Sequence, residues 1–244
     1  MMYVRLKSFV RRHRLLYWLA EFVRRHAQKV PIMGRGNRIV NRGILFNVRY
    51  NIRGNNNRVE IGQGTCLSDL TIYIRGDNHH LLFGENCRMS GGELWFEDHN
   101  CVISIGANTT IEDAHLAASE PYKSITLGND CMLSSRIEIR TGDSHSILNT
   151  QTGQRINYAQ NVVLGDHVWV GANAVILKGV KIDHNAIVST GAIVTSNVLA
   201  HTLVAGMPAR AIKANVDWLR GRIYGQADAL TDAQGRPLSS IHMV

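Results

Sequence analysis

The chain has 244 residues, 45% of them hydrophobic but only 7% aromatic, so one large domain or two small ones must be filled mainly by aliphatic side chains. Its formal net charge of +8 comes from the N-terminus, where residues 1–38 hold ten Arg or Lys residues and one acid, Glu21. The rest of the chain has 17 basic and 18 acidic residues. This balance, together with the lack of a nucleic-acid-binding motif, argues against nucleic acid as a partner.

We expect a cytoplasmic protein, because no membrane span or signal peptide is found in the sequence and because of how its cysteines are spaced. No apolar run reaches the roughly 20 residues of a membrane span, and the run at 15–20 is too short and too close to arginines to be a signal-peptide core. The four cysteines, Cys66, Cys87, Cys101 and Cys131, have no metal-binding spacing. We therefore expect buried thiols in a reducing compartment and no metal site.

The first predicted element is a basic amphipathic helix within residues 1–30. Between Val4 and His26 the apolar residues can form one stripe, and arginines fill much of the remaining surface. Such a helix can cover the open end of the next element. It can also lie on a membrane that contains anionic lipid, which would bring the protein to the inner face of that membrane.

A repeat of 22 residues follows the helix. The dipeptides at 61–62, 83–84, 105–106 and 127–128 each join an apolar residue to glycine, and another apolar residue comes six positions after each. Clusters of Gly, Asn and Asp recur eight positions before the glycines, which is typical of tight turns. The step then lengthens to 37 between Leu127 and Leu164, which predicts an extruded loop near 141–160.

From Val162 the repeat shortens to six residues. Eight consecutive six-residue units begin with Val or Ala. In the first six of these units the third position is a branched apolar residue. A helical period would lose this register within two turns, so the pattern predicts very short strands separated by turns. Three sixes make one coil of a parallel β-helix, with coils about 4.8 Å apart. We expect this solenoid over residues 31–213 and a C-terminal helix or tail over 214–244.

The rows VWVGANAVILKGV and VAGMPARAIK closely resemble the hexapeptide-repeat acyltransferases, over roughly 54–213. The 22-residue coils and the TGDSHSI loop are most similar to bacterial O-acetyltransferases that act on capsular polysaccharides of the polysialic acid type. The resemblance implies an all-β, left-handed parallel β-helix that assembles as a homotrimer. It also implies acetyl-CoA as co-substrate and a sugar hydroxyl of a surface polysaccharide as acceptor.

Two residues are the candidates for catalysis. His145 lies at the mouth of the predicted loop and matches the family's general base, a task that suits the pKa of histidine. Asp143 or a backbone carbonyl could orient its ring. Trp169 lies between two inward valines, so its indole is expected to point outward, where a neighbouring subunit could cover it and its N–H could stabilise an oxyanion.

The resemblance also supplies candidates for binding. Arg210 and Lys213 correspond to the basic pair that meets the CoA phosphates. Further contacts to CoA are expected from Ala172, Thr190, Thr195 and Ser196. The family often has lysine at the position of Ser196, so this contact is expected to be weaker. The aromatic residues that could stack on acceptor sugars are Tyr122, Trp95 and Tyr158.

Three other functions remain open at this stage. An N-acetyltransferase for a nucleotide-linked amino sugar would use the same base and CoA site. A zinc-binding β-helix would need three converging histidines, but His167, His184 and His201 step by 17 residues and drift across corners. A solenoid scaffold without activity would bind no CoA. The other histidines near predicted turns are His79, His80 and His99, and all six are expected to be solvated corner residues.

Overall fold

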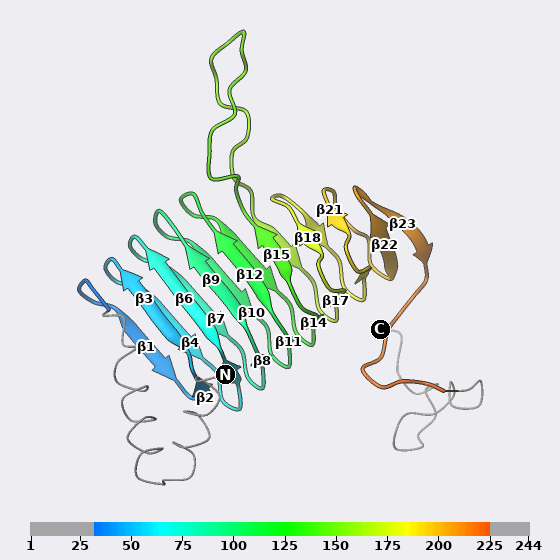
Figure 1. The fold of residues 1–244 in the computed structure, drawn as a ribbon, viewed down its shortest axis with the longest axis horizontal. Helices are drawn as coiled ribbons and strands as arrows, with labels where there is room; N and C mark the ends of the chain where they lie inside the picture. The colour runs from blue at the N-terminus through cyan, green and yellow to red at the C-terminus, as the bar shows by residue number, and fades with distance from the viewer. Residues whose placement is uncertain (1–31, 225–244) are drawn as a thin grey trace, which may run out of the picture.

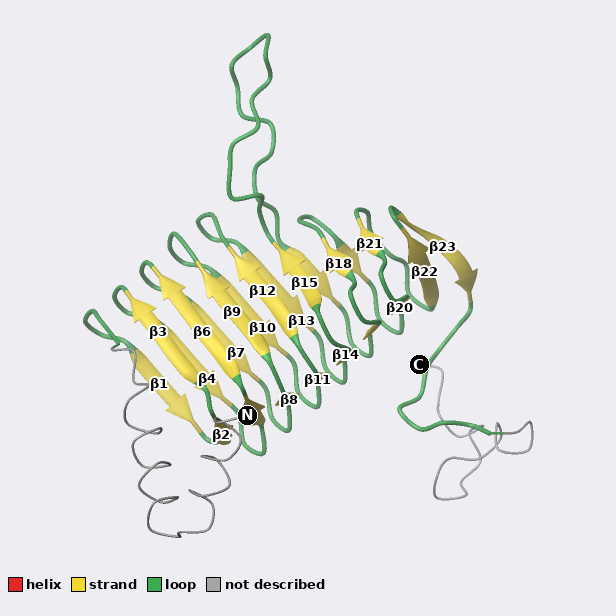
Figure 2. Ribbon diagram, viewed as in Figure 1, coloured by secondary structure: helices red, strands yellow, loops and turns green. Residues whose placement is uncertain are grey.

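A computed structural model describes residues 32–224, which form a single parallel β-solenoid and contain no α-helix (Figures 1 and 2). The predicted solenoid is confirmed. The predicted helix of residues 1–30 lies outside the described residues, and so does most of the predicted C-terminal segment. Within 214–224 the chain forms no helix. Among the described residues no helix is long and apolar enough to cross a membrane.

Three sheets run the length of the solenoid, and the chain visits them in turn. Sheet I contains β1 (Arg38–Asn41), β4 (Arg58–Ile61), β7 (His80–Phe83), β10 (Val102–Ile105), β13 (Ser124–Leu127), β16 (Val162–Leu164) and β19 (Lys181–Ile182). Sheet II contains β2 (Ile44–Phe46), β5 (Cys66–Ser68), β8 (Arg88–Met89), β11 (Thr110–Ile111), β14 (Met132–Leu133), β17 (Trp169–Val170), β20 (Ile187–Val188), β22 (Thr202–Gly206) and β23 (Ala209–Ala214). Sheet III contains β3 (Arg49–Arg53), β6 (Leu70–Arg75), β9 (Gly92–Phe96), β12 (Ala114–Ala118), β15 (Ile137–Arg140), β18 (Val175–Ile176) and β21 (Ile193–Val194).

In most strands the side chains alternate between the interior and the surface. In β6 the inward Leu70, Ile72 and Ile74 are at most 1% exposed, whereas the residues between them are half-buried. The eight residues of the predicted first column, from Val162 to Val204, are all buried, and so are the first six of the third column. Aliphatic side chains fill the bore because three facing sheets leave little room for larger ones.

Most corners of the solenoid turn through a residue with positive φ, and the predicted turn clusters lie there. At the corner between sheets III and I, residues Asn56, Asn78 and Asn100 have φ between 55° and 60°. Asparagine tolerates this conformation because its side chain can bond to nearby backbone. Beside them, Gly76 has φ +111°, and a Cβ there would lie 1.7 Å from the Asp98 carbonyl oxygen. Glycine is required at that position because coils stack so closely.

The extruded loop leaves the corner between sheets III and I. It connects β15 to β16 and projects well away from the solenoid, as the green segment in Figure 1 shows. Its two arms pair as a narrow hairpin through an antiparallel bridge between Leu148 and Arg155. The Ile156 amide also donates to the Ile147 carbonyl oxygen at 2.9 Å. The loop lies between Arg140 and Val162, in the part of the chain where the sequence predicts it.

Candidate active site

The root of the loop is organised by Asn157, which is only 7% exposed. Its side-chain amide donates to the Asp143 carboxylate and to the His145 carbonyl oxygen, both at 2.8 Å. Its Oδ1 accepts from the Ile147 amide at 2.7 Å and from the Arg155 Nε at 3.2 Å. Both arms of the loop therefore meet at one buried amide, which orders the backbone around His145. Sequence reasoning missed this residue.

Two ion pairs tie this root to the solenoid. Lys178 binds the Asp143 carboxylate, and Arg155 binds the Glu120 carboxylate. The hydrogen bond from Lys178 holds the pKa of Asp143 below its ordinary value. Burial raises the pKa of Glu120, but the hydrogen bond and charge of Arg155 outweigh it and leave this pKa low as well. Both carboxylates are ionised at neutral pH, and the loop stays anchored.

His145 presents its imidazole to solvent near this root. Its backbone amide donates to the Asp143 carbonyl oxygen at 2.7 Å, and the side chain is exposed. Within residues 32–224 its ring has no hydrogen-bond partner. The Asp143 carboxylate does not orient the ring, because it binds Lys178 and Asn157 instead. The local backbone of His145 is thus fixed, whereas its ring is free to meet a substrate.

Trp169 points outward from β17, as expected. Its neighbours Val168 and Val170 are fully buried, whereas Trp169 itself is 37% exposed. The ring lies 6.2 Å from that of Trp218, at 51°. Among the described residues its indole N–H has no hydrogen-bond partner, so this donor is available to a ligand on the outer surface of sheet II.

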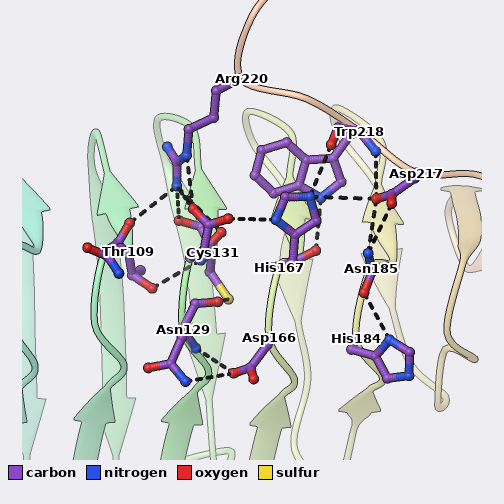
Figure 3. A network of polar contacts seen from close by, with 12 residues as sticks. Thr109, Asn129, Cys131, Asp166, His167, His184, Asn185, Asp217, Trp218 and Arg220 are labelled. Carbon is purple, nitrogen blue, oxygen red and sulfur yellow. Dashed lines mark hydrogen bonds and ion pairs between the residues drawn. The ribbon is translucent and has the colours of Figure 1, made fainter. Parts of the chain in front are cut away.

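Beside Trp169, the segment from Asp217 to Arg220 folds back onto the corner between sheets I and II. Trp218 is 4% exposed and stacks on His167, with ring centroids 4.0 Å apart. The two residues also exchange hydrogen bonds, from the Trp218 indole to the His167 carbonyl at 2.8 Å and between the His167 Nε2 and the Trp218 carbonyl at 3.0 Å. Figure 3 shows this stack. The second ring nitrogen of His167, Nδ1, lies 2.7 Å from the Asp130 carboxylate.

Arg220 completes this attachment. Its guanidinium binds the Asp130 carboxylate at 2.9 Å and donates to the Thr110 hydroxyl at 2.8 Å and the Cys131 carbonyl at 3.1 Å. The sequence predicted a helix or tail from residue 214 onward, and it did not predict these contacts of Arg220. These partners lie about 90 to 110 residues away, so no local pattern reveals them.

The predicted phosphate-binding pair lies on the last strand, β23. This strand pairs with β22 antiparallel, so that Lys213 faces Leu203 and Arg210 faces Ala205. A register shift adds one residue between the two pairs. Because of this bulge, Arg210 and Lys213 project from the same face although they are three residues apart. Both are exposed, and this arrangement suits an anionic group.

The other candidates for CoA binding lie on the last coils, at two different corners. Ala172 and Thr190 lie at the corner between sheets II and III, where the Gly191 amide donates to the Ala172 carbonyl at 2.8 Å. Thr195 and Ser196 follow β21 and are exposed at the corner between sheets III and I. A single chain therefore does not gather all four in one groove.

His145 and Trp169 also lie apart within one chain. The loop leaves the corner between sheets III and I, whereas Trp169 lies on sheet II, which is the opposite side of the triangular cross-section. The structure does not bring the two predicted catalytic residues together in one copy of the chain.

The candidate acceptor aromatics lie on or near the same edge. Tyr122 is 70% exposed and contacts His99 edge to face, with centroids 5.6 Å apart. Tyr158 is 60% exposed, and the Arg155 guanidinium lies 5.0 Å from its ring centre. Trp95 lies on the outer face of sheet III, within β9.

Most of the corner histidines are accessible, but His79 is buried at 1% exposure, so its predicted solvation is wrong. Its Nδ1 accepts from the Cys101 amide at 3.2 Å, and its Nε2 lies 3.2 Å from the Arg75 carbonyl. Burial lowers the pKa of His79 and favours the neutral ring. Elsewhere, His184 and His201 contact each other edge to face, with centroids 5.3 Å apart.

The cysteines are free thiols, of which Cys87, Cys101 and Cys131 are buried and Cys66 is half-buried. Burial raises the pKa of Cys101 and of Cys131 to about 11. The predicted buried thiols are thus confirmed for three of the four residues. Among residues 32–224 no three His, Cys, Asp or Glu side chains are grouped so that they could hold a metal ion.

Comparisons with known proteins agree with this architecture. The family of bacterial transferase hexapeptides (six repeats) matches residues 161–196. A polysialic acid O-acetyltransferase of Neisseria meningitidis is 38% identical over 127 residues, which are 52% of this chain and 58% of that protein. A putative lipopolysaccharide biosynthesis O-acetyl transferase of Escherichia coli K12 is 30% identical over 58% of this chain and 74% of that protein.

The crystal structure of the polysialic acid O-acetyltransferase OatWY is similar over 80% of this chain and 92% of its own, with a TM-score of 0.76 and 31% identity. The chain spans a little over half the length of the meningococcal relative matched by sequence. With the hexapeptide match, these similarities in sequence and fold show that the chain belongs to the hexapeptide-repeat acyltransferase family.

Proposed function

We propose that the protein is an acetyl-CoA-dependent O-acetyltransferase that acts on a sugar hydroxyl of a bacterial surface polysaccharide. The proposal rests on the similarity to OatWY, which covers 80% of this chain and so includes 22-residue coils as well as six-residue repeats. The exposed His145 on an anchored loop supports it. The paired cations on β23 support the binding of CoA phosphates.

In the proposed reaction, the acceptor hydroxyl attacks the thioester carbonyl carbon of acetyl-CoA. The His145 imidazole accepts the hydroxyl proton as the new C–O bond forms. The tetrahedral oxyanion accepts a hydrogen bond from the Trp169 indole N–H. When the C–S bond breaks, the imidazolium returns the proton to the CoA sulfur, so that free CoA and the acetyl ester leave and the enzyme is unchanged.

This mechanism needs more than one copy of the chain, because His145 and Trp169 lie on opposite sides of one solenoid. We infer a homotrimer of left-handed solenoids in which the loop of one subunit reaches the Trp169 surface of the next. In such an assembly Ala172, Thr190, Thr195 and Ser196 would contact the CoA arm from two subunits, with Arg210 and Lys213 at its phosphates.

We infer that the reaction takes place in the cytoplasm, and that residues 1–30 hold the enzyme at the inner face of the membrane. The ten basic residues within 1–38 support this location by their attraction to anionic lipid. Deletion of residues 1–30 should abolish co-sedimentation with anionic vesicles. Unchanged pelleting would remove the membrane contact and leave the catalytic proposal intact.

The direct test is release of free CoA thiol from acetyl-CoA over a panel of capsular polymers and nucleotide-linked amino sugars. The proposal expects release that depends on a polymer, with a product that loses acetate in mild alkali, as O-esters do. Release with amino sugars alone, giving an alkali-stable amide, would identify an N-acetyltransferase instead. No turnover with any acceptor, and no rise in Tm with CoA, would favour a scaffold protein.

A further inference from the structure

The outer face of sheet III contains an ordered stack of three side chains. The Arg75 guanidinium lies over the Tyr73 ring, 3.9 Å from its centroid. On the other face, Tyr73 stacks on Trp95, with centroids 3.7 Å apart and planes 14° from parallel. Tyr73 and Trp95 are partners in the register of β6 and β9, so the stack runs along the solenoid axis.

This stack is rigid. The Arg75 guanidinium donates to the Asn51 carbonyl and to the Asn51 Oδ1, both at 3.0 Å, and to its neighbour's carbonyl, that of Ile74, at 2.9 Å. With Arg75 fixed, Tyr73 is held between a cation and the Trp95 indole. The indole therefore presents its opposite face in a fixed orientation, without the entropy cost of ordering it on binding.

The strand register leaves an opening beside that indole face. The residue in register with Trp95 on the next strand, β12, is Ala117, and the one after it, on β15, is Arg140. Trp95 and Arg140 lie two strand spacings apart, which is about 9.6 Å. Only the methyl group of Ala117 lies between them. A ring placed there needs van der Waals contacts of about 4 Å on each side, so one sugar ring fits.

The far side of this opening is formed by one cation, Arg140. Arg140 is 43% exposed and uses its Nε to bind Glu138. Within residues 32–224 its two terminal nitrogens have no hydrogen-bond partner, so both can donate to one carboxylate. The nearby acids are already engaged, because Glu138 binds Arg140 and Glu93 lies 3.5 Å from the His115 ring nitrogen. That imidazole closes one side, 6.2 Å from the Trp95 ring.

The position of the opening relates it to the reaction. Arg140 is the last residue of β15, and the extruded loop that carries His145 begins at the next residue. In Figure 2, β6, β9, β12 and β15 lie side by side, and the loop departs from the end of β15. A polymer that lies along this row is led to the root of the catalytic loop.

We propose that the Trp95–Ala117–Arg140 opening is a subsite for one carboxylate-bearing sugar ring of an acidic polysaccharide. The apolar face of the sugar stacks on Trp95, and its carboxylate binds the terminal nitrogens of Arg140. This subsite holds the polysaccharide close to the loop while other sugar units of the same polysaccharide are acetylated. The inference rests on the proposed function for the role of the bound polymer as acceptor.

Ala117→Phe is the sharpest test, because the side chain points outward and the new ring fills the opening without entering the core. Thr126→Phe is the matched control, since it adds the same ring to the outer face of sheet I, on β13, the next strand along the chain. The probes are polysialic acid, its carboxyl-reduced form and neutral dextran. Binding is measured by titration calorimetry on the full-length protein, and the rise in Tm with CoA serves as the folding control.

We expect polysialic acid to bind wild type and Thr126→Phe equally, and Ala117→Phe at least about tenfold more weakly. Arg140→Gln should remove the preference for polysialic acid over its carboxyl-reduced form. Equal binding by wild type and Ala117→Phe, or no binding of any acidic polymer, would overturn the subsite.

The failure of the subsite and the failure of the proposed function give different results. If acetyl transfer to a polymer occurs and the KM for that polymer is unchanged in Ala117→Phe, the subsite is refuted and the activity stands. If polysialic acid binds through the opening but no acetyl group is transferred to any acceptor, the subsite stands and the proposed activity is refuted.

Discussion

Replacing Asn157 by alanine should release the loop from its ordered conformation. The change removes four side-chain hydrogen bonds, two donated by the amide and two accepted by Oδ1. Each contributes about 0.5–1.5 kcal/mol net. Because water can reach the opened root and replace part of them, we expect the ordered loop to lose about 2–4 kcal/mol.

A loss of this size weakens the ordered state by well over tenfold, since 1.4 kcal/mol corresponds to a factor of ten. We expect kcat for acetyl transfer to fall by about ten- to hundredfold, because the backbone around His145 is no longer fixed. The Ile147 amide, which loses its acceptor at 2.7 Å, should exchange hydrogen faster. Initial rates of CoA release and hydrogen exchange by mass spectrometry measure the two effects.

The matched control is Gln154→Ala, in the same loop, where the side chain is exposed and has no hydrogen-bond partner among the described residues. It should leave both kcat and exchange unchanged. A wild-type kcat in Asn157→Ala, together with clearly faster exchange in the loop, would refute the reasoning, because a disordered loop would then be sufficient for catalysis.

Three further predictions concern the solenoid. Burial lowers the pKa of His79 below its ordinary 6.5, so the unfolded chain binds a proton that the folded chain excludes, and the free energy of unfolding should fall as the pH drops below about 6.5. In urea unfolding at several pH values, His79→Asn should weaken this pH dependence. An unchanged pH dependence in His79→Asn would contradict the role of His79. Trp218→Ala should cost about 3 kcal/mol of unfolding free energy, because it removes a stacked, buried indole; a loss under about 1 kcal/mol would show that the segment is loosely held. At pH 8 a thiol-exchange reagent should label Cys66 well before Cys101 and Cys131, whose pKa burial raises to about 11; equal rates would contradict their burial.

Sequence periodicity predicted the interior of this protein well because the solenoid repeats the same short-range geometry in every coil. An inward residue such as Val162 is specified by its place in the repeat, and so is a turn residue such as Asn78. The loop was predictable for the same reason, because the step between equivalent residues lengthens from 22 to 37 between Leu127 and Leu164.

Contacts that cross the repeat were not predictable in this way. Trp218 and His167 are 51 residues apart, and Arg220 reaches Asp130 across 90 residues, without any pattern in the sequence that joins them. Asn157 resembles any other polar loop residue until the two arms of the hairpin are placed together. Such contacts depend on how separate segments meet in three dimensions.

Two features were missed although the repeat contained a signal for them. His79 occupies the same corner position as Asn57 and Cys101, one coil away on each side, and both of those are buried. Tyr73 and Trp95 are likewise one 22-residue coil apart, so the period alone places their rings side by side. The repeat therefore contains one buried corner column, which includes His79, and one outward column, which includes Tyr73 and Trp95.

The role of His145 as general base is tested most directly by the His145→Ala variant at saturating acetyl-CoA and polymer. The account predicts that kcat for CoA release falls by about 10² or more, while CoA still raises Tm as it does in wild type. Full activity in His145→Ala would contradict the account, since the anchored loop would then not supply the base.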